Sequence, residues 1–341
     1  MKTRIPMVIA LALLALSTLS PQLSICFAQG SLTPPPGAPA PTMLTLSQIE
    51  PRTPVDATHT GSGGSSEFLI TQPGSYYLTT NVVGVSSLHG INISANNVTL
   101  DLNGFSLQGS SSALDAIYIH AGYTNVTVRD GNISDWSNAS PFYGYGIECY
   151  ANNVILERLN VSANRYGIFL TNSGVVLDCN CHNNAATGIY VVAGKVSGCE
   201  ALNNAATGIY VVMGTVSDCD ALNNTSYGIE VGNNCTVKNC TSDNNYDGVF
   251  VNGSYSQITG NTCSSNSDSG IEIPLTKDRI DNNTVGDNGS YGILEYSQNV
   301  DNIITRNFAP GNFVNYYQLS GNTDYAPVQI PSTATSPWAN F

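Results

Sequence analysis

The chain of 341 residues repeats one sequence pattern at a step of 20 or 21 residues. The pattern is clearest between Tyr166 and Gly248, where units such as TGIYVVAGKVSGCEALNNAA and TGIYVVMGTVSDCDALNNTS follow one another. A glycine opens each unit, and the same frame extends more loosely from Gly90 to Gly292. A repeat of this length is typical of a solenoid, in which each unit buries its apolar face only against its neighbours.

Each unit has the pattern of short strands. Ile189, Val191 and Val196 are apolar at strand-like spacing, and the turn residues between them lie too close together for a helix. A leucine-rich repeat has a similar period, but its LxxLxLxxN signature is missing. The sequence therefore predicts an all-β fold, a right-handed parallel β-helix solenoid of about ten coils of 20–30 residues, capped at both ends.

Two columns of turn residues support this fold. Successive units place Asp, Gly or Asn at one turn, and these residue types tolerate the left-handed backbone region, so a tight bend is expected at Asp178, Gly198, Asp218, Asn239 and Gly260. Pairs of asparagines recur at 183–184, 203–204, 223–224 and 244–245. We expect these amides to stack and to form hydrogen-bonded ladders along the solenoid axis.

The ends of the chain differ in composition from the repeats. Residues 1–28 have the charged start, apolar run and small-residue end of a secretory signal peptide. A lipobox at Cys26 is disfavoured, because Ile25 is too large for that cleavage. The predicted boundaries are a signal peptide at 1–28, a Pro-rich linker at 29–42, an N-terminal cap at 43–85, the parallel β-helix at 86–307 and a C-terminal cap at 308–341.

The charge balance limits the partners. Removal of the signal peptide takes away Lys2 and Arg4, so the mature net charge is 9 − 24 = −15. Such a chain repels nucleic acid and anionic membranes, and no later segment is long and apolar enough for insertion. The balance also disfavours an anionic polysaccharide unless Ca²⁺ bridges the contact. We therefore expect a secreted monomer (extracellular, cell-surface or periplasmic) without a cofactor, with Ca²⁺ left open.

Eight cysteines remain after loss of the signal peptide. Cys179, Cys199, Cys219 and Cys240 recur at the repeat period and so share one column. Stacked strands lie about 4.8 Å apart, but the parallel side chains of one column have poor geometry for a disulfide. Buried thiols are favoured over disulfides, although an even cysteine count in an exported protein leaves disulfides open. The sequence contains neither a CxxC motif nor a cluster of histidines, so no metal site is predicted.

The strand that opens each coil predicts a surface stripe. Its outward residues are aromatic with carboxylates between them, in the order Tyr118, Glu148, Phe169, Tyr190, Tyr210, Glu230, Phe250 and Glu272. Aromatic faces stack on sugar rings, so the stripe is a candidate binding surface for a polysaccharide or cell-surface glycan. A purely structural role, in which the rings stack on one another, is left open.

A long loop before Glu148 carries more aromatic residues, and we expect it to overhang the stripe and to wall a cleft with Trp136, Phe142, Tyr143 and Tyr145. The predicted substrate-binding residues are Tyr118, Trp136, Tyr143, Phe169, Tyr190, Tyr210 and Phe250. The candidate catalytic carboxylates are Glu148, Glu230 and Glu272. The last two lie two coils apart with Phe250 between them, and an alternative acidic cluster joins Glu148 to Asp115, Asp130, Asp135 and His120.

The repeat GIYVV…VSGCEALNN resembles the parallel β-helix repeats of the pectin-lyase-like superfamily, especially the short coils of NosD-like exported proteins. The run ITQPGSYYLTTNVVG…GINISANNVTLDLNGFSL and the ending SPWANF resemble exported bacterial β-helix proteins without an assigned activity. The resemblance implies the fold, whereas the superfamily hosts lyases, hydrolases, epimerases and inert spikes. The polygalacturonase motifs DD, GHG and RIK and the epimerase motif DPH are absent.

The sequence thus supports two function classes. The first is an exported protein that binds a neutral or weakly charged polysaccharide along the aromatic face, and that acts as a polysaccharide lyase or glycoside hydrolase if it is an enzyme. The alternative is a non-catalytic structural or adhesive surface protein, in which the solenoid is a rigid spacer. A metal-delivery role, by analogy with NosD, is disfavoured by the burial expected for the cysteines.

Overall fold

A computed structural model describes residues 51–110, 112–137, 143–296, 301–317 and 323–341. The predicted signal peptide, the linker and residues 43–50 of the predicted N-terminal cap lie outside the described residues. All of the named strands of the remainder pair in parallel with the strand one coil away, and the only helix among the described residues is the 3₁₀ turn η1 (Pro331–Thr333). No described helix is long and apolar enough to cross a membrane.

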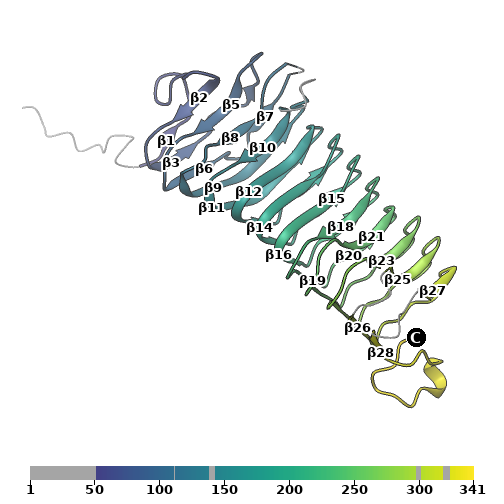
Figure 1. Cartoon of the computed structure of the whole chain (residues 1–341). Helices are drawn as coiled ribbons and strands as arrows, with labels where there is room; N and C mark the ends of the chain where they lie inside the picture. Colours follow the sequence, from purple (N-terminus) through teal and green to yellow (C-terminus); the bar gives the residue numbers. More distant parts are fainter. Residues whose placement is uncertain (1–50, 111, 138–142, 297–300, 318–322) are drawn as a thin grey trace, which may run out of the picture. The chain divides into compact units, whose positions relative to one another are not determined.

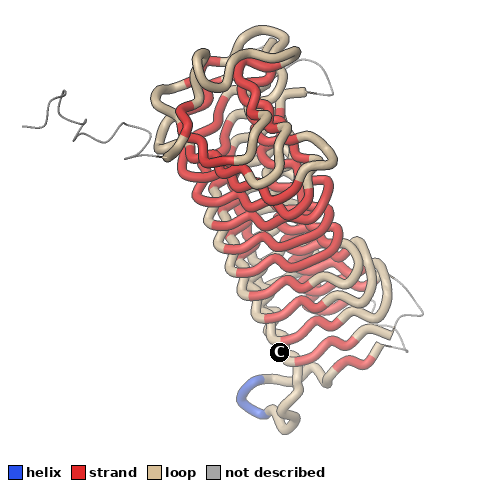
Figure 2. The backbone as a smooth tube through the Cα atoms, turned by 90° about the vertical axis from the view of Figure 1, so that its left-hand side faces the viewer, coloured by secondary structure: helices blue, strands red, loops and turns tan. Residues whose placement is uncertain are grey.

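The strands stack on three faces, of which the first two run through the whole stack and the third has named strands only as far as β20 (Figures 1 and 2). The first face consists of twelve strands joined by eleven parallel pairings among the described residues. Its members are β2 (Ser66–Ile70), β5 (His89–Ile93), β8 (Ile117–Ile119), β10 (Tyr145–Cys149), the first parts of β12 (Tyr166–Leu177), β14 (Ile189–Ser197) and β16 (Ile209–Ser217), then β18 (Tyr227–Val231), β21 (Asp247–Val251), β23 (Ser269–Ile273), β25 (Tyr291–Glu295) and β27 (Val314–Tyr317).

The second face continues through the later parts of β12, β14 and β16. Its other members are β1 (Thr53–Pro54), β3 (Gly74–Tyr77), β6 (Val98–Asp101), β9 (Thr124–Ser134), β11 (Asn152–Ser162), β19 (Thr236–Lys238), β22 (Gln257–Thr259), β24 (Arg279–Asp281), β26 (Ile303–Thr305) and β28 (Asp324–Tyr325). The third face also uses the ends of β9 and β11, with β4 (Val82–Val83), β7 (Ser106–Gln108), β13 (Asn180–His182), β15 (Glu200–Leu202), β17 (Asp220–Leu222) and β20 (Thr241–Asp243). The predicted parallel β-helix is confirmed, with twelve coils in place of about ten.

The coils extend beyond both predicted boundaries of the β-helix. Strands β2, β3 and β4 already pair with β5, β6 and β7, although they lie inside the segment predicted as an N-terminal cap. At the other end, β27 and β28 continue the stack past residue 307. The predicted β-helix is shorter than the observed stack because the end coils lack the repeated glycine and asparagine pair from which the repeat was recognised. These coils do keep the pattern of short strands.

The inside of the first face is a column of β-branched side chains. Ile147, Ile168, Ile189 and Ile209 occupy successive positions of the ladder, and each is fully buried. The period-two alternation of a strand turns every such residue inward and its neighbour outward. Burial of one side chain of this size contributes roughly 1.5–3 kcal/mol relative to exposure, so each coil adds a comparable apolar contribution through this column.

A ladder of buried asparagine amides runs along the axis beside this column. In Asn204, both the backbone N and Nδ2 donate to Oδ1 of Asn224, each at 3.0 Å, and Nδ2 also donates to the carbonyl of Cys181 at 3.0 Å. Related bonds link Asn164, Asn184, Asn204, Asn224, Asn245, Asn266, Asn288 and Asn312. The predicted amide ladder is confirmed.

Local backbone geometry fits the same pattern. The first asparagine of each pair has a positive φ, for example 53° at Asn203, and the predicted bends at Asp178 and Gly198 have φ of 50° and 63°. The repeated glycine before each strand leaves room for the ladder. A Cβ at Gly208 would lie 2.6 Å from Nδ2 of Asn224 and 2.7 Å from the carbonyl oxygen of Gly228, so a larger residue would push the coils apart.

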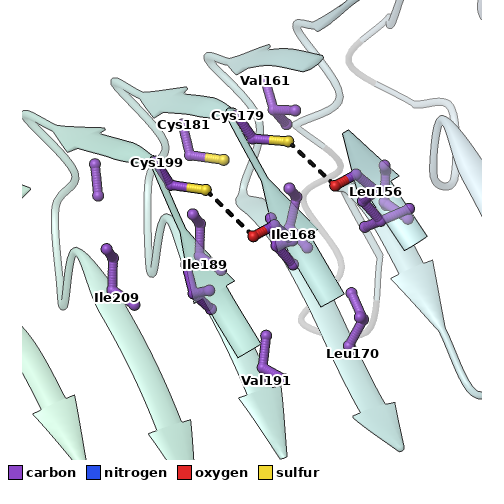
Figure 3. Close-up of a cluster of buried hydrophobic side chains, with 14 of the residues drawn as sticks. Leu156, Val161, Ile168, Leu170, Cys179, Cys181, Ile189, Val191, Cys199 and Ile209 are labelled. Atoms are coloured by element: carbon purple, nitrogen blue, oxygen red, sulfur yellow. Dashed lines mark hydrogen bonds between the residues drawn. The ribbon is translucent and has the colours of Figure 1, made fainter. Parts of the chain in front are cut away.

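The eight cysteines of the described residues are buried free thiols. Cys179 and Cys199 come from successive coils and point in the same direction (Figure 3). Each donates to a backbone carbonyl of the preceding coil, at 3.7 Å to Leu156 and 3.6 Å to Val176. Cys149 occupies the inward position that Leu170 fills in the next coil, and burial raises the pKa of its thiol to about 12. The cysteines are therefore part of the core.

The first prediction concerns these thiols. Because they are buried, iodoacetamide is expected to leave them unmodified in the folded protein and to modify them all after denaturation without a reductant. Mass spectrometry measures the number of modified cysteines. Cys199→Ala is expected to cost about 1 kcal/mol, because only a sulfur-sized void remains. Detection of paired cysteines in the denatured, unreduced chain would contradict the thiol assignment.

The second prediction concerns Asp278, which interrupts a shorter ladder between Ser256 and Asn302. Its Oδ1 accepts from the backbone N of Ser256 at 2.7 Å, but its Oδ2 is buried without a hydrogen-bond partner among the described residues. Burial raises the pKa of this carboxyl from 3.8 to about 7. The folded chain therefore binds the proton more tightly than the unfolded chain, and the free energy of unfolding falls as the pH rises from about 4 to about 7.

Asp278→Asn is expected to remove that penalty, because an amide carries no charge and neighbouring ladder amides such as Asn302 donate Nδ2 to a carbonyl. The gain is at most about 4 kcal/mol above pH 7, since each pKa unit corresponds to about 1.4 kcal/mol. Thermal melts at pH 4 and pH 8 measure it: the variant should melt several degrees higher at pH 8 and close to the parent at pH 4. A lower melting temperature at pH 8 would show that the carboxylate has a stabilising partner.

Candidate functional site

The predicted stripe forms one column in the structure. Strand register places Glu148 opposite both Tyr118 and Phe169, and it continues through Tyr190, Tyr210, Glu230, Phe250 and Glu272. The aromatic members are half-buried, whereas the three glutamates are less than 10% exposed. The order of the stripe is thus confirmed, but its carboxylates are more enclosed than an outward strand position implies.

Rings of the stripe and of an adjacent column cover one another. Phe169 stacks on Tyr190 with ring centroids 4.7 Å apart and an interplanar angle of 15°. Tyr190 meets Tyr210 edge to face at 5.1 Å, and Tyr227 of the adjacent column stacks on Phe250 at 4.4 Å. A glycan that lies along this part of the stripe would therefore meet ring edges more than free ring faces.

Ionisable groups converge on one cleft at the N-terminal part of the stripe. The cleft has a volume of about 380 Å³. Strands β5, β8 and β10 and the loop before β10 supply most of its lining, which consists of Ser65, His89, Tyr118, His120, Tyr143, Tyr145, Glu148 and Tyr150. None of these described lining residues is lysine or arginine, so the cleft offers carboxyl, imidazole and phenol groups without a fixed cation.

Glu148 lies at the centre of the stripe segment in this cleft and is 6% exposed. Tyr150 donates its hydroxyl to Oε1 of Glu148 at 2.7 Å. Burial raises the pKa of Glu148 to about 7, an effect that the bond from Tyr150 opposes and the nearby charge of Asp115 reinforces. Near neutral pH this carboxyl group therefore exists in both its protonated and its ionised form, which suits proton transfer.

His89 forms the opposite part of the cleft. Its Nδ1 lies 3.1 Å from Oδ2 of Asp115, and its ring stacks on Tyr118 with centroids 4.7 Å apart. Asp115 is fully buried, and its Oδ1 accepts from the backbone N of Gly144 and of Tyr145, each at 2.9 Å. The carboxylate therefore holds the end of the long loop that leads into β10, and the backbone N of Asp115 donates to Nδ1 of His89 at 3.4 Å.

His120 completes the set of imidazoles. It packs edge to face against Tyr118 at 4.7 Å, and its Nε2 lies 3.2 Å from Nδ2 of Asn92. Burial, followed by the charge of His89, lowers the pKa of His120 below its usual value.

The long loop is only partly as predicted. Tyr143 lines the cleft and approaches His89 edge to face at 6.2 Å. Trp136 instead lies in the core with 0% exposure, and its Nε1 donates to the carbonyl of Leu107 at 3.2 Å. The placement of Trp136 over the cleft is therefore corrected, because the large apolar ring returns to fill the space above Gly84 and Gly90.

The alternative acidic cluster is divided by the structure. Asp115, His120 and Glu148 meet in the cleft, whereas Asp130 pairs with Arg158 at 2.6 Å and Asp135 is exposed. Glu230 and Glu272 lie farther along the stripe, and Glu272 is close to Asp247 and Asp268. Their catalytic role stays a prediction.

Sequence reasoning missed His89 and Tyr150 as members of the site. It expected Tyr145 to wall the cleft, together with Phe142, which lies outside the described residues. His89 begins its strand, and Tyr150 follows β10 directly, so neither of them occupies the outward strand position that defines the stripe. The useful signal was the concentration of His and Tyr at the ends of the longer, less regular coils between residues 89 and 150.

Comparisons with known proteins agree with this architecture. The model of the right-handed β-helix region matches residues 63–217 and 213–323. The A-module of mannuronan C-5 epimerase AlgE6 from Azotobacter vinelandii has a similar structure, with a TM-score of 0.62 and 16% identity over 82% of this chain and 89% of that chain. A search of curated proteins finds no match.

Two further solved structures share the fold. The Dettilon tailspike protein gp208 has a TM-score of 0.54 and 12% identity over 81% of this chain and 59% of that chain. The pectate lyase Pel9A has a TM-score of 0.51 and 16% identity over 75% of this chain and 74% of that chain. The chain thus belongs to the right-handed β-helix family and has the fold of the pectin-lyase-like superfamily.

Proposed function

We propose that the cleft around Glu148 binds a polysaccharide and hydrolyses it by general acid–base catalysis. The observation that carries the proposal is the convergence of a proton-active carboxyl group, a His–Asp pair and four tyrosines in one cleft on the aromatic face. Support comes from the fold relatives, since the names of two of them describe enzymes of polysaccharides, a mannuronan epimerase and a pectate lyase. We further propose that the protein acts after export, in line with the predicted signal peptide.

The roles follow from the environments of the two ionisable pairs. Glu148 in its protonated form donates a proton to the glycosidic oxygen while the bond to the anomeric carbon breaks. His89, held by Asp115, accepts a proton from the water that adds to that carbon. Asp115 is fully buried and accepts two backbone bonds, so it positions the imidazole and does not attack the sugar. Tyr150 holds Oε1 of Glu148 and so positions the acid.

The lining of the cleft favours a neutral or weakly charged glycan. Elimination on a uronic acid needs a positive group to neutralise the sugar carboxylate as the neighbouring carbon loses its proton. The described lining residues include no lysine or arginine, and the chain as a whole is acidic. Tyrosines instead offer apolar rings and hydroxyl donors, which suit sugar rings. We therefore place hydrolysis ahead of the lyase reaction.

A second candidate function is a structural or adhesive role for the solenoid. The ring stacking between Phe169, Tyr190 and Tyr210 favours it, because these side chains satisfy one another across neighbouring strands. On this hypothesis the stripe stabilises the stack and has no glycan partner.

The third prediction is that Glu148→Gln abolishes hydrolysis and leaves glycan binding within a few-fold of the parent. The amide keeps the shape and still accepts from Tyr150, but it cannot donate the required proton. The measurement starts with a screen of neutral polysaccharides on a glycan array, followed by a reducing-end assay on each bound glycan. Glu230→Gln is the matched control, because it removes a buried glutamate of the same column outside the cleft.

The pH profile separates catalysis from folding. Since the acid must be protonated, the rate should fall as the pH rises through about 7. Tyr150→Phe removes a hydrogen bond that favours the ionised form, so the pKa of Glu148 should rise and the alkaline limb should move to higher pH. Full activity in Glu148→Gln, or an unchanged alkaline limb in Tyr150→Phe, would contradict these roles.

The stripe is tested by replacing Tyr190, Tyr210 and Phe250 together with Ser. The variant should melt at a lower temperature, since each lost ring pair contributes roughly 0.2–1 kcal/mol. It should bind long glycans more weakly while still hydrolysing short fragments that occupy only the cleft. No binding to any glycan by the parent protein, together with this loss of stability, would favour the structural role.

A further inference from the structure

Three carboxylates meet on the first face, and the nearest of them to the cleft, Asp247, lies five strands beyond β10. Asp247 begins β21, Asp268 directly precedes β23, and Glu272 lies within β23. One oxygen from each lies within 4.8 Å of the oxygens offered by the other two. Strand register accounts for the meeting: Val249 lies opposite Ile271 and Phe250 opposite Glu272, so Asp247 is level with Ser269, the residue after Asp268.

Asp247 is buried with an oxygen that lacks a partner. It is 1% exposed, and its Oδ1 accepts from the backbone N of Ser269 at 2.7 Å. Its Oδ2 has no hydrogen-bond partner among the described residues, and the same holds for Oγ of the adjacent, fully buried Ser269. An unpaired carboxylate oxygen in such a position is costly unless a positive group neutralises it.

A buried carboxylate elsewhere in the stripe, by contrast, has hydrogen-bond donors. Glu230 is also buried, but Thr207 donates to it at 3.4 Å and Asn252 donates at 3.2 Å. Around Asp247 and Glu272 the structure places further acid instead, and no ion pair within the described residues involves any of the three carboxylates. A cation from solution would supply the missing partner, and the half-buried Asp268 is the most accessible of the three carboxylates.

The donor set identifies the class of cation. All three donors are carboxylate oxygens, without nitrogen or sulfur, so a hard divalent ion is favoured over zinc or copper. Magnesium requires a near-ideal octahedron with bonds of about 2.1 Å and keeps several of its waters, whereas calcium takes six to eight oxygens at about 2.3–2.6 Å, so a site of three protein carboxylates favours calcium. Calcium also accepts the irregular geometry that a strand and a loop provide.

We propose that Asp247, Asp268 and Glu272 form a calcium site that joins two consecutive coils of the β-helix. The ion neutralises the three carboxylates and ties β21 to the start of β23. This site is separate from the cleft around Glu148, and it does not depend on the proposed hydrolysis.

The fourth prediction tests the site on the full chain after treatment with a chelator. Calcium chloride alone is expected to bind with a stoichiometry of one by titration calorimetry and to raise the melting temperature, whereas magnesium chloride alone should have a much smaller effect. Asp247→Asn and Glu272→Gln should each weaken calcium binding at least about tenfold, because each removes one of three charged ligands. Glu230→Gln should keep the calcium response of the parent.

A further comparison distinguishes a calcium site from a pair of carboxyl groups that share a proton. Without calcium, Asp247→Asn should melt at or above the temperature of the parent, because it removes repulsion while its Oδ1 still accepts from Ser269. If Asp247→Asn fails to fold, Asp268→Asn gives the same test at a half-buried position. No heat of binding and no thermal shift at millimolar calcium would overturn the proposal. A calcium response that Asp247→Asn, Asp268→Asn and Glu272→Gln all retain would also overturn it.

Discussion

The structure depends on buried asparagine amides that bond from coil to coil. The ladder amides from Asn164 to Asn288 are enclosed in protein, where an unpaired donor or acceptor would cost about 1–3 kcal/mol. The only geometry that satisfies them all is one in which every coil lies directly over the next, as Asn204 does over Asn224. Hydrophobic burial alone would tolerate a sliding of one coil over another. The hydrogen bonds between the amides do not tolerate such a sliding. They therefore fix the columns of residues that make up the surface.

The cleft arises where the regular repeat is interrupted. Between His89 and Tyr150 the coils are longer, and the loop that precedes β10 brings Tyr143 and Tyr145 over the face. Asp115 connects this irregular segment to the regular one, since it holds both the loop backbone and His89. The regular coils thus act as a rigid support, and the ionisable groups gather at the less regular end, as is usual for sites on solenoids and barrels.

The sequence predicted those features of the structure that follow from its repeat period. The fold, the turn column, the amide ladder and the order of the stripe all follow from residues that recur at one spacing, and Glu148 was found because it occupies the outward position of that frame. Trp136 was misplaced because it lies in a loop, and periodicity does not tell whether a loop side chain returns to the core. His89 and Tyr150 were missed because they lie at strand ends, where only the three-dimensional path of the chain brings them to Glu148. The group of Asp247, Asp268 and Glu272 depends likewise on a loop residue that meets two strand residues of different coils.

The role of the buried amides in holding the coils in register is tested most directly by amide hydrogen exchange on an Asn224→Ala variant. The substitution leaves Asn204 without its acceptor and the carbonyl of Ala201 without the donor at 2.9 Å. Protection should fall in the coils that contain Asn204, Asn224 and Asn245, while β5, β8 and β10 keep the protection of the parent, and the exposed neighbour variant Thr225→Ala should change neither region. Unchanged protection around Asn224 would contradict the claim that the buried amides hold the coils in register.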